Sequence, residues 1–304
     1  MKFKQNRAKF KKLMFDKHHI TNMFVAQDAL SAKIAEDLGY EAIFVAGYAT
    51  SASDLSLPDR GIADFDTMLN KCREIINATN LPVFADADTG YGDLANVART
   101  VKNYEAIGAA GIFLEDQQWP KRCGHMDGKR IEPVDVLAAK IKTAVTTRKH
   151  DDFLIMSRTD ARAVEGLQAA TDRSQIYKMA GADLIFIEAP ESIAELKAIH
   201  TAFPDTPLMA NMIENGKTPD LTPTELQQLG FSLVVHPTAS VYTEMAAMKK
   251  MLTTLKETGS TKSLKDEMIT FPEFNHLMGL EKLNDFETKY NTENMQKQLT
   301  AWGI

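Results

Sequence analysis

A unit made of an amphipathic helix, a glycine and a short apolar run recurs along this chain, and it constrains the fold more than any other feature. The unit occurs as DLGYEAIFVAGY, AIGAAGIFLEDQ, MAGADLIFIEAP and QLGFSLVVHP. Its glycines, Gly39, Gly108, Gly181 and Gly230, suit the left-handed position that ends a helix. Three further apolar runs lack the glycine (LPVFADADTG, FLIMSRTDA and PLMANM), and ITNMFVAQD indicates a first strand. The chain therefore contains eight strand–helix units.

The apolar runs are nearly continuous, which is typical of strands buried on both faces of a parallel sheet. Eight such units close naturally into an α/β fold of the (β/α)8 barrel type; a doubly wound open sheet is the alternative that periodicity leaves open. Amphipathic helices lie between the runs, for example at Leu30, Ile34 and Leu38. No Pro-, Gly- or Ser-rich linker interrupts the sequence. We therefore expect one domain over residues 1–304, with a helical segment from about residue 245.

Composition excludes several classes of protein. A chain of 304 residues, 44% hydrophobic and 25% charged, can bury a sizeable core. Its net charge of -6 argues against a nucleic-acid partner, and no run approaches the roughly 18 apolar residues of a membrane span. Two cysteines cannot form a disulfide framework, and the basic opening MKFKQNRAKFKK lacks the apolar stretch of a secretory signal. We expect a cytoplasmic protein without nucleic-acid or membrane partners.

Acidic side chains follow the apolar runs, where the strands end. Asp86 and Asp88 are two residues apart, so their carboxylates share one face, and Glu115 ends the next strand. In a barrel of this kind the active site lies at the carboxyl ends of the strands. Carboxylate-rich oxygen ligation suits Mg²⁺ or Mn²⁺. The alternative is that these acids cap the following helices, but three acids on adjacent strand ends favour the metal.

Another strand end carries Arg158, whose guanidinium group is suited to binding a carboxylate through two hydrogen bonds. The alternative role for this residue is a structural ion pair with Asp160 or Glu188. The sequence leaves both roles open.

Cys123 lies in a polar stretch, WPKRCGHMDGK, although cysteine usually packs among apolar neighbours. The basic residues around it are expected to lower the pKa of the thiol and raise its reactivity. Gly124 and Gly128 would let this loop move and close over the site. The alternative is an incidental surface cysteine. Cys72, in an apparent helix, is expected to pack in the core.

Eight motifs occur in order over nearly the whole chain: GYATSASDLSLPD, DADTGYG, LEDQ, PKRCGH, GK, SRTDA, EAP and NMIENGKTP. This series resembles the isocitrate lyase/phosphoenolpyruvate mutase superfamily. KRCGH is the signature of its carbon–carbon lyase branch, which includes 2-methylisocitrate lyase and 2,3-dimethylmalate lyase, and carboxyphosphonoenolpyruvate mutase also carries such a loop. The resemblance implies a (β/α)8 barrel whose eighth helix is exchanged between paired subunits, in a homotetramer of two such pairs. FPEFNHLMGLEKLNDFETKY would belong to the exchanged segment.

The resemblance also implies a role for each matching residue. The implied magnesium ligands, direct or through water, are Asp86, Asp88 and Glu115, with Asp59 near the same site. Arg158 would bind the substrate, assisted by the backbone amides of Gly47 and Tyr48. The remaining implied pocket residues are Glu188 and Asn211. Cys123 would be the general acid, carried by a gating loop that Lys121, Gly124 and His125 complete.

The implied activity is magnesium-dependent retro-aldol (Claisen-type) cleavage of a 2-hydroxy di- or tricarboxylic acid, of the 2-methylisocitrate or dimethylmalate type. The products would be an α-keto acid and a second carboxylic acid. Tyr48, Glu188 or metal-assisted ionisation could deprotonate the hydroxyl group, and the sequence does not choose among them. The alternatives are phosphorus–carbon bond formation as in carboxyphosphonoenolpyruvate mutase, an oxaloacetate hydrolase or decarboxylase, and a noncatalytic carboxylate-binding protein.

Several residues depart from the family pattern. Ala46 stands where serine is usual, and Phe24 and Val25 replace a Pro-Gly pair, which predicts an altered pocket floor. Phe44 and Phe113 replace the tyrosine and histidine typical of methylisocitrate lyases. One more departure, Pro237, stands where oxaloacetate hydrolases carry serine. It therefore favours a lyase over that hydrolase.

Overall fold

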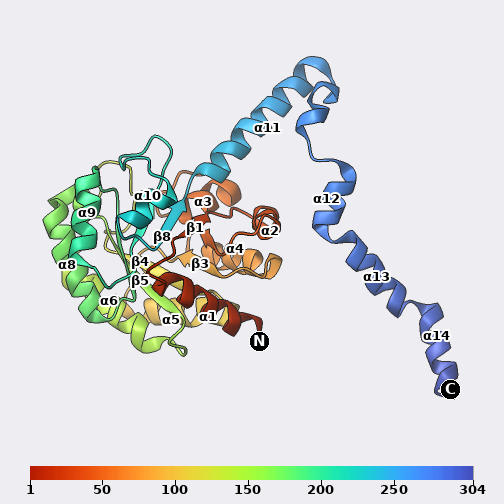
Figure 1. Ribbon diagram of the computed structural model, residues 1–304, viewed down its shortest axis with the longest axis horizontal. Coiled ribbons are helices and arrows are strands. Elements are labelled where there is room, and N and C mark those ends of the chain that lie inside the picture. The colour runs from red at the N-terminus through yellow and green to blue at the C-terminus, as the bar shows by residue number, and fades with distance from the viewer. Residues whose placement is uncertain (304) are drawn as a thin grey trace. The chain divides into compact units, whose positions relative to one another are not determined.

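The computed structural model describes residues 1–303 and is drawn in Figure 1. The chain separates into two compact units, residues 1–244 and 245–304. No helix within residues 1–303 combines the length and the apolar character that crossing a membrane requires.

The first unit is built on eight parallel strands. They are β1 (Thr21–Phe24), β2 (Ile43–Val45), β3 (Val83–Asp86), β4 (Gly111–Glu115), β5 (Leu154–Thr159), β6 (Leu184–Ile187), β7 (Met209–Asn211) and β8 (Leu233–His236). Strands β2 to β6 pair in sequence order, and β8 pairs with both β1 and β7. Single bridges from Val25 to Phe44 and from Ile185 to Leu208 join the two sheets at both edges. The predicted barrel is therefore confirmed, and the open-sheet alternative is wrong.

Helices surround the strands of this unit (Figure 1). They are α1 (Lys2–Phe15), α2 (Ala29–Asp37), α3 (Gly47–Leu55), α4 (Phe65–Ala78), α5 (Leu94–Ile107), α6 (Val134–Thr147), α7 (Ala161–Glu165), α8 (Leu167–Ala180), α9 (Ile193–Ala202) and α10 (Pro223–Gln228). All four glycines of the repeated unit have positive φ, between +80° and +113°. This backbone conformation is the one that glycine adopts without steric cost, so the predicted helix ends are confirmed.

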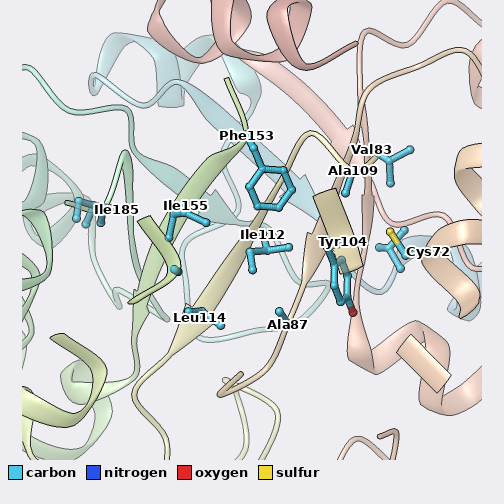
Figure 2. Packing of buried hydrophobic residues seen from close by; sticks show 14 of the residues in the cluster. Cys72, Val83, Ala87, Tyr104, Ala109, Ile112, Leu114, Phe153, Ile155 and Ile185 are labelled. Carbon is cyan, nitrogen blue, oxygen red and sulfur yellow. The ribbon is translucent and has the colours of Figure 1, made fainter. Parts of the chain in front are cut away.

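Alternation along each strand divides the core into two layers. On β4, Ile112 and Leu114 face the outer helices, whereas Phe113 lies in the barrel interior. Figure 2 shows the outer layer, where Ile112 and Leu114 lie with Tyr104 of α5 and Cys72 of α4. Cys72 is fully buried, so its predicted packing role is confirmed.

Helix α1 packs against the interior layer. Its Phe10 stacks on Phe84 of β3, with ring centroids 5.2 Å apart. A sheet rolled into a barrel has no exposed edge and encloses its own core. Interior side chains therefore continue toward the carboxyl ends of the strands as the floor of the site.

Helix α2 differs from the amphipathic expectation. Leu30, Ile34 and Leu38 have exposed fractions of 42%, 41% and 71%. Ala32 and Ala35 are the side chains that α2 buries. Small side chains let the helix approach the strands closely, so the larger apolar side chains are left at the surface.

The second unit is helical, as expected. Helix α11 (Ala239–Thr258) leads into it, followed by η1 (Lys262–Glu267), α12 (Phe271–Met278), α13 (Leu280–Tyr290) and α14 (Thr292–Ala301). No residue of α11, α12, α13 or α14 is buried, and Phe271 of α12 is 81% exposed. This unit therefore carries apolar side chains that are uncovered within a single chain.

Candidate active site

Because side chains alternate along each strand, the functional side chains lie together at the carboxyl ends of the strands. Asp86 follows the interior residue Phe84 by two positions, and Glu115 follows Phe113 in the same way. Arg158 continues the interior face of β5 beyond Met156. All of these polar side chains are at least nine-tenths buried. The carboxyl ends of neighbouring strands thus bring two carboxylates and a guanidinium group together, as the barrel prediction requires.

An ammonium group lies among the acids. The Nζ atom of Lys121 is 2.7 Å from Oδ1 of Asp59 and 2.8 Å from Oδ1 of Asp88. Burial by itself would lower the pKa of Lys121, but the carboxylates of Asp88 and Asp59 raise it well above its usual value. Within residues 1–303 no three His, Cys, Asp or Glu side chains are arranged as the ligands of a metal ion. Lys121 supplies the positive charge that these acids need.

The acids nevertheless fit a divalent cation. Oε1 of Glu115 is buried and has no hydrogen-bond partner, and burial raises the pKa of Glu115 well above its usual value. Burial also raises the pKa of Asp88 to about 7, despite its contact with Lys121. Buried carboxylate oxygens without a full set of partners are the ligands that a hard cation prefers. The helix-cap alternative is wrong, because Asp93 caps α5.

Asp88 also has an unusual backbone, with a φ of +48°. Non-glycine residues in this region carry strain, which is common at functional sites. Its amide donates a hydrogen bond to Oδ1 of Asp86 at 2.8 Å. The two acids are thus held together by their own backbone.

Arg158 is surrounded by carboxylates. Its Nε lies 3.2 Å from Glu115 and 3.0 Å from Asp160, and its Nη2 lies 3.1 Å from Glu188. The structural ion pairs given as its alternative role are therefore present. Burial alone would lower its pKa, but Asp160, Glu115 and Glu188 raise it, so the guanidinium group is charged. A substrate carboxylate that binds here would share this fixed cation with the three acids.

Cys123 lies in the loop of residues 116–133, between β4 and α6, and it lines the central cavity. Its basic neighbours point at acids: Lys121 contacts Asp59, and Nε2 of His125 is 3.3 Å from Glu188. Burial raises the pKa of the Cys123 thiol to about 11, and the negative charges of Asp59 and Glu188 add to this effect. The predicted lowering of this pKa is wrong, because burial outweighs the basic neighbours and Lys121 is itself paired with two carboxylates. The thiol stays protonated, which is the state that a proton donor requires.

The loop approaches the strand ends closely at Gly124. A Cβ atom at this position would lie 2.5 Å from the Glu188 side chain. His125 is held from the other side, because the amide of Lys217 donates to its Nδ1 at 3.0 Å. Glycine is therefore required for the closed loop by lack of space rather than by backbone angle.

The other predicted residues lie at the same end of the barrel. The amide of Gly47 donates to Oδ2 of Asp86 at 3.0 Å, and Nδ2 of Asn211 donates to Oε2 of Glu188 at 3.1 Å. The hydroxyl oxygens of Tyr48 and Tyr242 are 3.1 Å apart. Burial raises the pKa of Tyr48, and its neighbours raise it further. Tyr48 is consequently protonated and a poor base.

A cavity of about 40 Å³ lies between these side chains. It has room for roughly three water molecules and is too small for a dicarboxylic acid. Nine of the predicted site residues line it: Tyr48, Asp59, Asp86, Lys121, Cys123, Gly124, Arg158, Glu188 and Asn211. Gly47, Asp88, Glu115 and His125 contact these residues from just outside it. The loop therefore has to open to admit a substrate.

Sequence reasoning did not single out three lining residues, Met209, Ile213 and Thr238. Met209 belongs to β7, and the other two follow the ends of β7 and β8. Position after a strand end is the signal that could have found Ile213 and Thr238. The apolar Met209 carries no such signal.

Comparison with known proteins places these features in a family. Residues 10–256 match the family described as phosphoenolpyruvate phosphomutase. The solved structure of a 2,3-dimethylmalate lyase, a member of the phosphoenolpyruvate mutase/isocitrate lyase superfamily, has a TM-score of 0.88 to this chain at 30% identity, covering 93% of this chain and 95% of its own. This chain belongs to that superfamily.

Two curated relatives show where within the superfamily the similarity lies. A 2,3-dimethylmalate lyase from Eubacterium barkeri is 47% identical over 267 residues, which cover 88% of this chain and 92% of the relative. A chloroplastic carboxyvinyl-carboxyphosphonate phosphorylmutase from Arabidopsis thaliana is 46% identical over 268 residues, covering 87% of this chain and 79% of the relative. The resemblance inferred from the motifs is thus confirmed.

The departures of this superfamily member from the family pattern fall into two groups. Phe44, Ala46, Phe113 and Pro237 all line the cavity, where they can contact a substrate. Phe24 and Val25 do not line it: Phe24 packs on Tyr40, and Val25 is buried in the barrel interior. Neither side chain lines the cavity directly, so the expected change in the pocket floor stays a prediction.

Proposed function

We propose that this protein is a carbon–carbon lyase that cleaves a 2-hydroxy dicarboxylic or tricarboxylic acid into an α-keto acid and a second carboxylic acid. The observation that carries the proposal is the half-buried, protonated Cys123 thiol, which lines the cavity at the carboxyl ends of the strands together with Arg158. The 47% identity to a 2,3-dimethylmalate lyase supports the same reaction class.

The lining of the cavity favours a methyl-substituted malate over 2-methylisocitrate. Phe44 and Phe113 present aromatic rings to the site, 5.9 Å apart between centroids. Such rings suit methyl groups. A further carboxylate on the substrate would lose its hydration against these apolar rings, which is costly.

The proposed chemistry divides between substrate binding and proton transfer. Arg158 binds a substrate carboxylate. Loss of the hydroxyl proton turns the 2-hydroxyl carbon into a carbonyl, and the electrons of the broken carbon–carbon bond pass to the neighbouring carbon. The Cys123 thiol gives its proton to that carbon, which completes the second acid. Of the two side chains considered as the base, Glu188 is ionised, because burial would raise its pKa but Arg158 and His125 lower it.

A divalent cation, Mg²⁺ or Mn²⁺, belongs to this proposal. Asp86, Asp88 and Glu115 would hold it, with Asp59 beside them. When bound, such a cation supplies a Lewis acid for oxygen atoms of the substrate. The support is the donor set itself, three buried carboxylates with an unpartnered oxygen on Glu115.

A mutase reaction is the second candidate, and the 46% identity to a carboxyvinyl-carboxyphosphonate phosphorylmutase favours it. It would form a phosphorus–carbon bond, which ³¹P NMR detects directly. An oxaloacetate hydrolase is a weaker candidate, because Pro237 lines the cavity where that enzyme would place serine.

We also propose that the protein is a homotetramer of helix-exchanged pairs. The unburied helices α11 to α14 and the apolar outer face of α2 support a second copy as the occupant of both. A cytoplasmic location, where the two free cysteines would stay reduced, completes the proposal.

An α-keto acid release assay tests the function. We expect the purified enzyme with Mg²⁺ to cleave 2,3-dimethylmalate, 2-methylisocitrate, isocitrate or oxaloacetate, with the first preferred, and EDTA to abolish turnover. Cys123→Ser should reduce turnover by several orders of magnitude while folding is retained, because a hydroxyl is a much weaker acid than a thiol.

The other cysteine provides the control. Cys72→Ala lies in the outer core layer and should leave turnover per folded molecule near the wild-type value. Full turnover by Cys123→Ser would remove the thiol from the mechanism. No release from any of the four acids would direct the search to phosphonates.

A further inference from the structure

Lys129 is a buried cation that the proposed reaction does not use. Its side chain is 2% exposed. Its Nζ atom donates a hydrogen bond to Oδ1 of Asp160 at 2.8 Å and another to the carbonyl oxygen of Gly124. A buried ammonium group is costly unless its hydrogens are taken up, so these two acceptors determine where the side chain lies.

The first acceptor is held rigidly by the barrel. The amide of Asp160 donates to Oδ1 of Asp116 at 2.9 Å. Asp116 also accepts hydrogen bonds from Thr159 at 2.6 Å and from Tyr177 at 3.1 Å. Asp160 therefore occupies a position at the end of β5 that is specified by both its backbone and its surroundings. It can anchor Lys129 without moving.

The second acceptor belongs to the moving part of the site. Gly124 follows Cys123 directly in the chain, and both line the cavity. A bond that holds the Gly124 carbonyl also sets where the Cys123 thiol points. Lys129 thus ties the loop to the strand end on which Arg158 also lies.

We propose that Lys129 is a positioning residue for Cys123: anchored on Asp160, its ammonium group holds the Gly124 carbonyl and so keeps the loop closed over the site. The inference rests on the proposed function for the role of the thiol, but its structural part does not. Losing the bond would make the open loop more populated and would expose the thiol.

The two cysteines allow a direct measurement. Cys123 is half-buried with the loop closed, so we expect iodoacetamide to react with it faster when the loop opens, whereas the fully buried Cys72 reacts only when the barrel unfolds. Peptide mass mapping of the full-length protein gives both rates in one sample. Unchanged protection of Cys72 shows that a variant is folded.

We expect Lys129→Met to raise the alkylation rate of Cys123 by about ten- to a hundredfold, the range for losing a hydrogen bond with a charged donor. Lys129→Arg keeps the charge and its donors and should stay closer to wild type. Lys140→Met is the matched control, because its ammonium group also donates to a backbone carbonyl, that of Thr89 at 2.8 Å, but not to the loop of Cys123. The alkylation rate of Cys123 should not change in Lys140→Met.

Lys129→Gln, which removes the positive charge and keeps an amide NH2 group, replaces the methionine variant if Cys72 of that variant loses its protection. A wild-type Cys123 alkylation rate in folded Lys129→Met, or in folded Lys129→Gln where that variant replaces it, would overturn the proposal. In the release assay, Lys129→Met should lower kcat more than it changes KM. Faster alkylation without turnover in any form of the enzyme would leave the loop role intact and reject the lyase function instead.

Discussion

A thiol can serve as a proton donor only if it keeps its proton until the substrate needs it. Cys123 meets this condition through burial and through two carboxylates, those of Asp59 and Glu188. Local sequence suggested the opposite, since three basic residues stand within two positions of it. Burial decides the outcome, because it raises the pKa of the thiol more than neighbouring positive charge lowers it.

This environment predicts how the thiol titrates. At pH 9.5 an ordinary cysteine is roughly nine-tenths ionised, whereas less than roughly a tenth of Cys123 should be, given a pKa of about 11. The thiolate absorbance near 240 nm, taken as wild type minus Cys123→Ser, measures this fraction. A midpoint near pH 8.5 would contradict the buried position of the thiol.

The same shift has a consequence for stability. The folded state holds the thiol proton more tightly than the unfolded chain does. Its contribution to the free energy of unfolding is therefore complete below about pH 8.5 and is lost as the pH rises toward 11.

At the scale of the element, the loop of residues 116–133 is fastened along its length by polar contacts to the barrel. Lys121 pairs with Asp59, His125 contacts Glu188, and Lys129 contacts Asp160. With the loop closed, the cavity of about 40 Å³ is too small for a substrate. Opening is consequently part of every turnover, and these contacts have to break and form again.

Gly124→Ala tests whether closure is needed. The added methyl group would lie 2.5 Å from Glu188, so the loop cannot reach its closed position without displacing that side chain. We expect kcat to fall by at least about tenfold, because misplacing a reacting group by about an ångström slows the reaction strongly. Steady-state kinetics of Gly124→Ala measure the change in kcat.

Asp127→Ala is the matched control in the same loop, because its carboxylate is exposed and pairs only with Lys217. Exposed ion pairs contribute little, so kcat should stay near the wild-type value. Equal kinetics in the two variants would show that the closed loop is not the catalytic state.

At the scale of the whole molecule, one barrel contains the complete proposed site within residues 1–244. The helices of residues 245–303 contribute no residue to the cavity and carry exposed aromatic side chains. Apolar patches of this kind are typical of subunit interfaces. The proposed catalytic site and most of the apolar surface proposed for assembly thus lie in different parts of the chain.

Phe271→Asp tests the assignment. Burying this side chain against a second copy would contribute about 2 kcal/mol, so its loss should weaken assembly by about thirtyfold or more. Light scattering after size-exclusion chromatography at decreasing protein concentration measures the change. Gln296→Asp adds the same charge at a polar, exposed position of α14 and should assemble normally. Identical masses for wild type and Phe271→Asp at every concentration would contradict the proposed interface.

The sequence by itself determined the barrel and most of the site. Continuous apolar runs of strand length, several of them preceded by a glycine that ends a helix at positive φ, are local properties of the chain. Because side chains alternate along a strand, the positions of Asp86, Glu115 and Arg158 at strand ends also followed from counting residues. Local periodicity was sufficient for these features.

Only the tertiary structure decided what depends on contacts between distant segments. Lys121 and its partner Asp59 are 62 residues apart, and no local pattern connects them. The pKa direction of Cys123 and the outward face of α2 both depend on which surfaces are covered. Burial is a property of the whole fold, since it depends on every element packed around a side chain. The pKa directions of the site residues therefore follow from the tertiary structure and not from the local sequence.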